Sequence, residues 1–105
     1  MSLPRRGEIW WGESPDAKSR PYVVLTRDEA IPVLRTILVA PVSRTVRGIP
    51  SEILLGTDEG LAVECAASCD AILPFPRAML VRRVGRLGPE RISELCGAAR
   101  AAIDC

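Results

Sequence analysis

The chain has 105 residues, a net charge of +1 and 48% hydrophobic residues, which indicates one domain, residues 1–105, with a modest core. No apolar run approaches the roughly 20 residues that cross a bilayer, so we expect a cytoplasmic protein without a membrane segment. The chain contains no histidine, which excludes a ribonuclease mechanism based on two imidazoles.

The distribution of charge is more informative than its sum. Residues 30–51 contain arginines and no acid, and so do residues 71–88. Basic charge collected on part of a near-neutral protein is typical of a phosphate-binding face. The alternative is a set of solvated arginines that do not meet in space.

Short apolar runs between turn formers predict a sheet. The predicted strands cover residues 8–11, 21–26, 36–42, 51–55, 61–70 and 79–87. We expect the third strand to be buried on both faces, and the first to carry one tryptophan on each face. The remaining segments are predicted as a polar loop at 12–20, a loop at 28–34, a proline break at 74–76 and a helical turn at 77–79.

The only predicted helix follows Gly88, a suitable N-cap, with Pro89 at the first helical position and Glu90 at the positive end of the dipole. Apolar residues then recur with a helical period at Ile92, Leu95, Cys96, Ala99 and Ile103. Together the elements predict a mainly β protein: a small, strongly bent sheet or partial barrel with a C-terminal helix as a lid.

The four cysteines are Cys65, Cys69, Cys96 and Cys105. In the cytoplasm we expect them to be reduced. Cys65 and Cys69 would share a strand face and be buried as small apolar groups. Their spacing is not that of a zinc ribbon, and we expect no metal and no thiol nucleophile.

Two short stretches carry the candidate chemistry. Arg20 precedes the proline that opens the second predicted strand, and Ser43 follows the third. If these strands are neighbours, a guanidinium and a hydroxyl meet in a cationic pocket that suits a phosphodiester. The alternatives are a surface ion pair of Arg20 with Glu13 or Asp16, and a Ser43 hydroxyl that satisfies a backbone group in a turn.

The strings RGEIWW (6–11), SRPYVVL (19–25), VAPVSRTVRGIPSE (39–52) and VGRLGPER (84–91) resemble the MazF/PemK family of toxin endoribonucleases. This resemblance implies an SH3-like barrel of the plasmid-maintenance-toxin type and a homodimer with RNA sites at its interface. The implied partners are a MazE-like antitoxin and single-stranded RNA. The RNA is mRNA, with rRNA or tRNA as alternatives. The implied activity is sequence-specific cleavage that needs no metal or cofactor and leaves a 2′,3′-cyclic phosphate and a 5′-hydroxyl.

The resemblance also assigns residues. Arg20 matches the catalytic arginine of the family, and Ser43 stands where a catalytic threonine is usual. Because an arginine side chain does not readily give up its proton, we expect Arg20 to stabilise charge on the phosphorane and not to act as the base. The predicted RNA-binding residues are Thr45, Arg47, Arg44, Asp16 and Lys18. The first loop is shorter than in many family members, and Asp16 is the candidate replacement for an acid missing from it.

Two other functions are compatible with this fold. A gyrase-poisoning toxin of the CcdB kind resembles this family in fold, but its activity depends on a tryptophan near the C-terminus. Here both tryptophans, Trp10 and Trp11, lie near the N-terminus. The other alternative is a catalytically inactive module that binds RNA or antitoxin.

Overall fold

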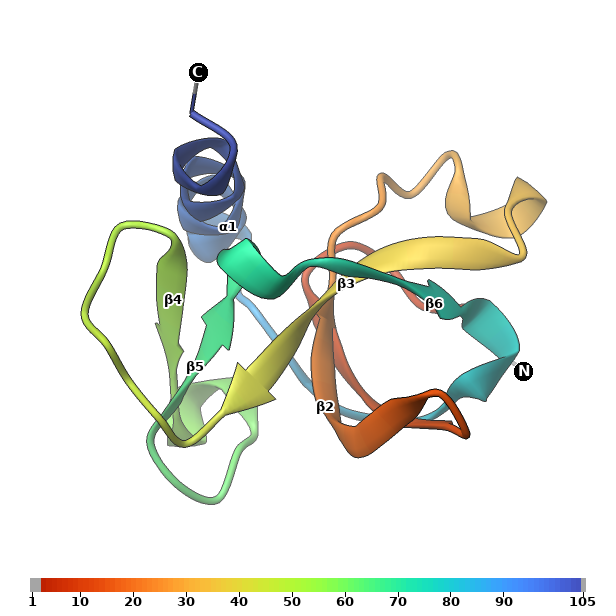
Figure 1. The fold of residues 1–105 in the computed structure, drawn as a ribbon, viewed down its shortest axis with the longest axis horizontal. Coiled ribbons are helices and arrows are strands. Elements are labelled where there is room, and N and C mark those ends of the chain that lie inside the picture. The colour runs from red at the N-terminus through yellow and green to blue at the C-terminus, as the bar shows by residue number, and fades with distance from the viewer. Residues whose placement is uncertain (1–2, 105) are drawn as a thin grey trace.

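The computed structural model describes residues 3–104, a bent antiparallel sheet of seven strands with one helix packed on it (Figure 1). The strands are β1 (Glu8–Ser14), β2 (Ala17–Val24), β3 (Thr36–Ser43), β4 (Glu52–Leu55), β5 (Cys65–Ser68), β6 (Leu73–Pro76) and β7 (Leu80–Arg86). The helix is α1 (Pro89–Ala102), and short 3-10 turns cover Ile31–Val33, Thr57–Glu59, Cys69–Ala71 and Arg77–Met79. The mainly β fold class with a C-terminal helix is confirmed.

The strand order is β4-β5-β3-β2-β1-β7, and β6 pairs with β3 beside this path. The sheet does not close on itself, so the description as a barrel applies only loosely. Among residues 3–104, no helix has the length and apolar character needed to span a membrane.

β3 organises the sheet because it pairs with three other strands. Its first half lies against β6, its middle against β2 and its last two residues against β5. The prediction that both faces of this strand are buried is wrong for its first half, where Leu38 is 49% exposed. Within β3, Val39 and Ala40 are the only two consecutive residues that are both buried, and each packs in a different hydrophobic cluster.

The predicted loop at 12–20 is wrong. These residues form a tight hairpin in which Ser14 of β1 pairs with Ala17 of β2 across a two-residue turn. Pro21 lies inside β2, opposite Trp11, and does not begin the strand. Proline is tolerated there because β2 pairs with β3 only from Tyr22 onward, so no second neighbour requires the missing N–H.

The predicted proline break at 74–76 is also wrong, because these residues belong to β6. Pro74 pairs with Leu38 and Pro76 with Thr36, while the N–H of Arg77 donates to the Arg35 carbonyl at 2.8 Å. The backbone N–H groups of the odd-numbered residues of β6 therefore point toward β3. The nitrogens of Pro74 and Pro76 point away from β3, toward the open edge. The helical turn at 77–79 is confirmed.

The strand predicted for residues 61–70 is shorter than expected. Only Cys65–Ser68 is a strand, residues 61–64 are irregular, and Cys69 lies in a 3-10 turn. Cys65 and Cys69 are buried as predicted, but they do not share a strand face. Cys105 lies outside the described residues.

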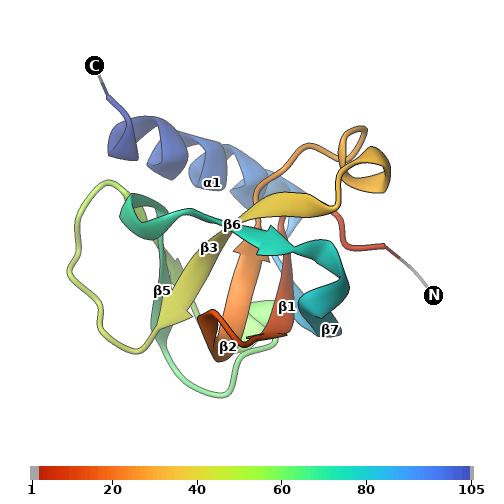
Figure 2. The same ribbon diagram turned by 45° about the vertical axis from the view of Figure 1, so that its right-hand side comes forward.

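The helix begins at Pro89 after the Gly88 cap, as predicted, and lies across one side of the sheet (Figure 2). It buries Leu95 and Ala98 in a core cluster that includes Ile9, Val23 and Ile53 together with buried residues of β3 and β5. A second cluster, away from the helix, contains Tyr22, Val24, Ile31, Ile37, Val39, Phe75 and Leu80. Ile103, which the periodicity places on the apolar face, follows the end of the helix and is 72% exposed.

Candidate functional site

A groove of about 540 Å³ opens where the β1–β2 hairpin meets the end of β3. Its polar lining consists of Lys18, Arg20, Ser43 and Arg44. Its apolar lining includes Trp11, Pro21, Val42 and the irregular segment 61–63, with Cys65 at the base of that segment. We call this feature the cationic groove. The register of β2 against β3 thus brings Arg20 and Ser43 to one site, as expected if the two strands are neighbours.

Arg20 supplies an unpaired positive charge to the cationic groove. Within residues 3–104, no carboxylate lies within ion-pair distance of its guanidinium, although the side chain is only partly exposed. Glu13, an expected alternative partner, instead accepts a hydrogen bond from the Trp11 indole at 3.0 Å. Burial raises the pKa of the neighbouring Tyr22, and the positive charge of Arg20 partly opposes this rise.

Ser43 ends β3, and its hydroxyl has one partner on its own chain. The Oγ atom accepts a hydrogen bond from the N–H of Thr45 at 3.1 Å, which is the turn interaction expected as the alternative to function. In the described residues, the same hydroxyl donates to no acceptor. Its oxygen is therefore held in place while its proton remains available to an anion in the groove.

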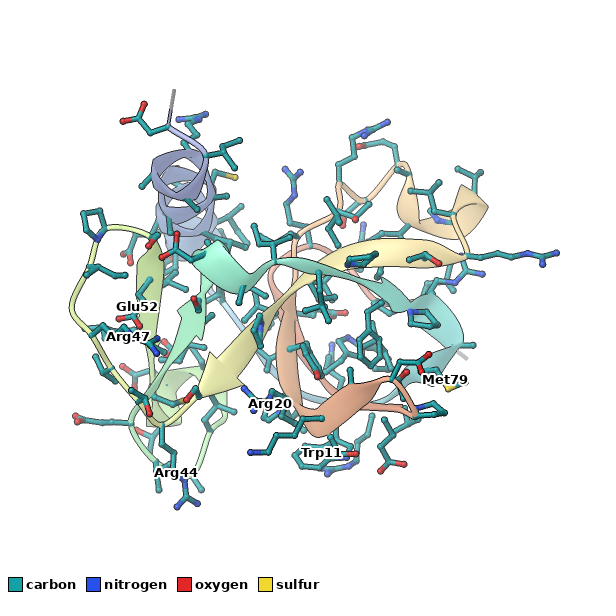
Figure 3. All side chains as sticks on the ribbon, in the orientation of Figure 1. Trp11, Arg20, Arg44, Arg47, Glu52 and Met79 are labelled. Carbon is teal, nitrogen blue, oxygen red and sulfur yellow. The ribbon has the colours of Figure 1, made fainter. Side chains whose placement is uncertain are left out.

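The other predicted site residues divide into two groups. Lys18 and Arg44 line the cationic groove, and Arg44 projects outward from the end of β3 (Figure 3). Thr45, Arg47 and Asp16 do not line it. Arg47 lies beside Glu52, as Figure 3 shows, and Asp16 is exposed in the hairpin turn. Contact of these three residues with RNA stays a prediction.

Trp11 was not among the predicted site residues, although it forms a wall of the cationic groove. Trp10 instead packs against the second core cluster, and its indole donates to Glu8 at 3.1 Å. Alternation along β1 predicted that the two indoles face opposite ways. Only the pairing of Trp11 with Pro21 decides which of them reaches the groove.

The buried thiols are not nucleophiles at neutral pH. Burial raises the pKa of Cys65, Glu59 raises it further, and Arg44 opposes the rise. Burial also raises the pKa of Cys69, to about 11, with smaller contributions from Asp70 and Cys96. Both thiols therefore stay protonated near pH 7. Among residues 3–104, no group of three carboxylate or thiol side chains is placed to bind a metal ion.

Comparison with known families identifies the chain. The profile of the "PemK-like, MazF-like toxin of type II toxin-antitoxin system" matches residues 5–103. The chain belongs to this family. The protein named "Probable endoribonuclease MazF5" from Mycobacterium tuberculosis is 44% identical over 106 residues, which is 99% of this chain and 96% of that relative. The resemblance seen in the sequence is confirmed, and the chain is a MazF-type endoribonuclease toxin.

Solved structures agree in fold. "Mycobacterium tuberculosis toxin MazF-mt6" superimposes with a TM-score of 0.84 at 32% identity, covering 92% of this chain and 96% of that one. A mycobacterial endoribonuclease solved in complex with its cognate antitoxin has a TM-score of 0.83 at 17% identity, covering 95% and 94% of the two chains. At that identity the likeness shows the fold alone.

Proposed function

We propose that the chain cleaves single-stranded RNA at specific sequences in the cationic groove, without a metal ion or cofactor. The observation that carries this proposal is the meeting of an unpaired guanidinium, Arg20, and an available hydroxyl, Ser43, from two neighbouring strands. Both groups recognise a phosphodiester, and an arginine fork binds two phosphate oxygens at once.

The RNA supplies its own nucleophile. The 2′-oxygen forms a bond to phosphorus, the bond to the 5′-oxygen breaks, and the products are a 2′,3′-cyclic phosphate and a 5′-hydroxyl. Arg20 stabilises the negative charge on the phosphorane, and Ser43 donates a further hydrogen bond to it. The lining of the groove holds no carboxylate, so water takes the 2′-proton and a proton from solvent or Arg20 reaches the leaving oxygen.

The remaining groups bind the strand on either side of the scissile phosphate. Lys18 and Arg44 contact the flanking phosphates from the groove lining. Thr45, Arg47 and Asp16 extend the RNA path beyond the groove. Trp11 offers a face on which an unpaired base stacks, the usual way in which proteins read single-stranded RNA.

The partners follow from charge and apolar exposure. An acidic, MazE-like antitoxin segment complements the cationic groove and occludes it, and the complex of a structural neighbour with its antitoxin supports such a partner. A second copy of the chain covers the apolar outer surface of β3 and β6, where Leu38 is 49% exposed. We place the protein in the cytoplasm, where its RNA substrate is found.

The test is incubation of the purified protein with a long transcript in EDTA, followed by sequencing of the cut ends. We expect cuts at a defined motif with 5′-hydroxyl and cyclic phosphate ends, and their loss in Arg20→Ala. Arg100→Ala, an exposed arginine on α1, is the matched control and keeps full activity. Uncut RNA, or cutting that survives Arg20→Ala, overturns the proposal. Uncut RNA together with inhibited gyrase would favour the alternative function, a gyrase-poisoning toxin of the CcdB kind.

A further inference from the structure

The connection between β3 and β4 contains neither helix nor strand, yet side chains hold its backbone at two points. We call residues 44–50 the arginine loop. At its start, Ser43 Oγ accepts the Thr45 N–H at 3.1 Å. In its middle, one carboxylate oxygen of Glu52 accepts two backbone N–H groups, from Arg47 at 2.9 Å and Gly48 at 3.0 Å.

The Glu52 side chain is only 2% exposed, although it stands at the beginning of an edge strand. A buried carboxylate is costly unless donors surround it, and here the donors are supplied by the loop itself. The second carboxylate oxygen lies 4.0 Å from the Arg47 guanidinium, whose side chain is 62% exposed and remains largely in solvent. The contact between Glu52 and the loop therefore depends mainly on the two backbone amides.

The backbone geometry of the loop suits this contact. Gly48 has φ of +69°, in the left-handed region, and nothing lies within 4 Å of the position of a Cβ atom. The glycine is therefore needed for its conformation and not for space. The N–H groups of the consecutive residues Arg47 and Gly48 both point at one carboxylate oxygen, as in the anion-binding concavities called nests. In this loop the anion is the carboxylate of Glu52.

We infer that Glu52 is a positioning residue for RNA cleavage: its carboxylate holds the arginine loop and so fixes Arg44 at the cationic groove and Thr45 against Ser43. This inference rests on the proposed function, because it is the cleavage reaction that uses Ser43. The connection runs from Glu52 through the amides of Arg47 and Gly48 to the Thr45 N–H that orients the Ser43 hydroxyl. Glu52 itself touches no substrate.

Two substitutions separate hydrogen-bond reach from charge. Glu52→Gln keeps an acceptor oxygen at the same distance from the backbone but removes the charge. Glu52→Asp keeps the charge but shortens the side chain by one methylene, so that it no longer reaches both amides. If the two amide bonds position the loop, the Gln variant cleaves RNA at close to the parental rate. The Asp variant loses up to about 100-fold in kcat/KM, the scale expected for a misplacement of about 1 Å.

The direct measurement is amide hydrogen exchange by NMR without RNA, combined with cleavage kinetics of the same preparations. The Arg47 and Gly48 amides should be protected in the parent and in Glu52→Gln, and should exchange rapidly in Glu52→Asp. Protected amides at Val39 and Ala40 in the sheet show that each variant is folded. Glu94→Asp, the same shortening at an exposed carboxylate on α1, is the matched control and changes neither readout.

Protection that persists in Glu52→Asp, or is lost in Glu52→Gln, overturns the assignment of the two bonds. Loss of protection with unchanged kcat/KM overturns the positioning role. A parent protein that cuts no RNA overturns the proposed function instead, and does so whatever the amides show. The three failures are thus distinguishable.

Discussion

At the scale of single residues, phosphate binding in the cationic groove depends on whether the Arg20 guanidinium is free of ion pairs. Arg20 has no carboxylate partner among residues 3–104, but the strand around it is held firmly. The Tyr22 hydroxyl donates to the Lys18 carbonyl, and the Tyr22 ring lies against Phe75 with ring centroids 4.7 Å apart. An unpaired cation on a firmly held strand is available to bind a phosphate without first breaking another ion pair.

Ser43 should tolerate only residues that keep its hydroxyl. In Ser43→Ala the donor to the phosphate is lost, and so is the acceptor for the Thr45 N–H, so we expect kcat/KM to fall by about 100-fold or more. Ser43→Thr keeps both roles and should remain within a small factor of the parent. Steady-state cleavage of a fluorogenic oligonucleotide measures both variants. Equal activity of the Ala and Thr variants would remove Ser43 from the reaction.

Trp11 should report on bound RNA. A base stacked on its indole quenches the fluorescence of that indole, whereas Trp10, packed against the core, does not sense the groove. We therefore expect quenching on addition of an uncleavable oligonucleotide with a 2′-deoxy sugar at the cut site. The quenching should disappear in Trp11→Phe and persist in Trp10→Phe. Loss of stacking costs about 1–3 kcal/mol per base, so Trp11→Ala should also bind RNA at least fivefold more weakly. Persistent quenching in Trp11→Phe would contradict this role.

At the scale of elements, the sequence predicted the helix and those strands whose own residues form a clear apolar pattern. The strand at 36–42 and the helix after Gly88 are examples, since an apolar run and an N-terminal proline mark them. The hairpin at 12–20 was missed because its polar residues face solvent, and pairing between its arms makes it a strand. β6 was missed because its prolines are tolerated only where β6 forms an edge, which depends on tertiary pairing.

The same distinction applies to the site. Arg20 and Ser43 were found because each flanks an apolar run, and neighbouring strands carry both to one end of the sheet. The irregular segment 61–63 was not found, since its apolar residues follow a β pattern in the sequence but pair with no strand among residues 3–104. Local pattern indicates burial, whereas the walls of a groove are set by segments that come together from distant parts of the chain.

The hairpin should be sensitive to added volume at Gly12. A Cβ atom there would lie 2.8 Å from Phe75 Cζ and 2.8 Å from Tyr22 Cδ2, inside the packed contact that supports the strand of Arg20. Gly12→Ala should therefore lower the free energy of unfolding by about 1–3 kcal/mol, as overpacked cores do. Urea denaturation measures this change. Gly97→Ala on α1, where nothing lies within 4 Å of the added atom, is the control and should not destabilise. An unaffected Gly12→Ala would show that the rings shift freely.

At the scale of the whole molecule, the free energy of unfolding should fall at alkaline pH because of Cys69. Burial raises the pKa of this thiol from 9.0 to about 11, so the folded protein keeps a proton that the unfolded chain releases earlier. The resulting stabilisation is fully present below about pH 9 and is lost as the pH rises to about 11. Urea midpoints under reducing conditions should show the stability advantage of the parent over Cys69→Ala shrinking over that range. Parallel curves for the two proteins would contradict the assignment.

The apolar outer surface of β3 and β6 should control the oligomeric state. Leu38 is 49% exposed and pairs with Pro74, which is exposed beside it, and Met79 follows them with 39% of its surface exposed. The prolines remove the N–H groups that another strand would need at this edge, so a second copy should pack through side chains and not extend the sheet. Because a charge in such a contact is desolvated without a partner, Leu38→Asp should convert a dimer to a monomer.

Size-exclusion chromatography with light scattering measures this change directly. Leu54→Asp is the matched control, since Leu54 is 58% exposed but lies on β4, at the other edge of the sheet. This variant should keep the mass of the parent, because it places the same charge on a surface that the second copy does not cover. A monomeric parent would exclude the dimer. A Leu38→Asp variant that stays dimeric would move the interface to another face, and the Leu54→Asp variant would then show whether that face includes β4.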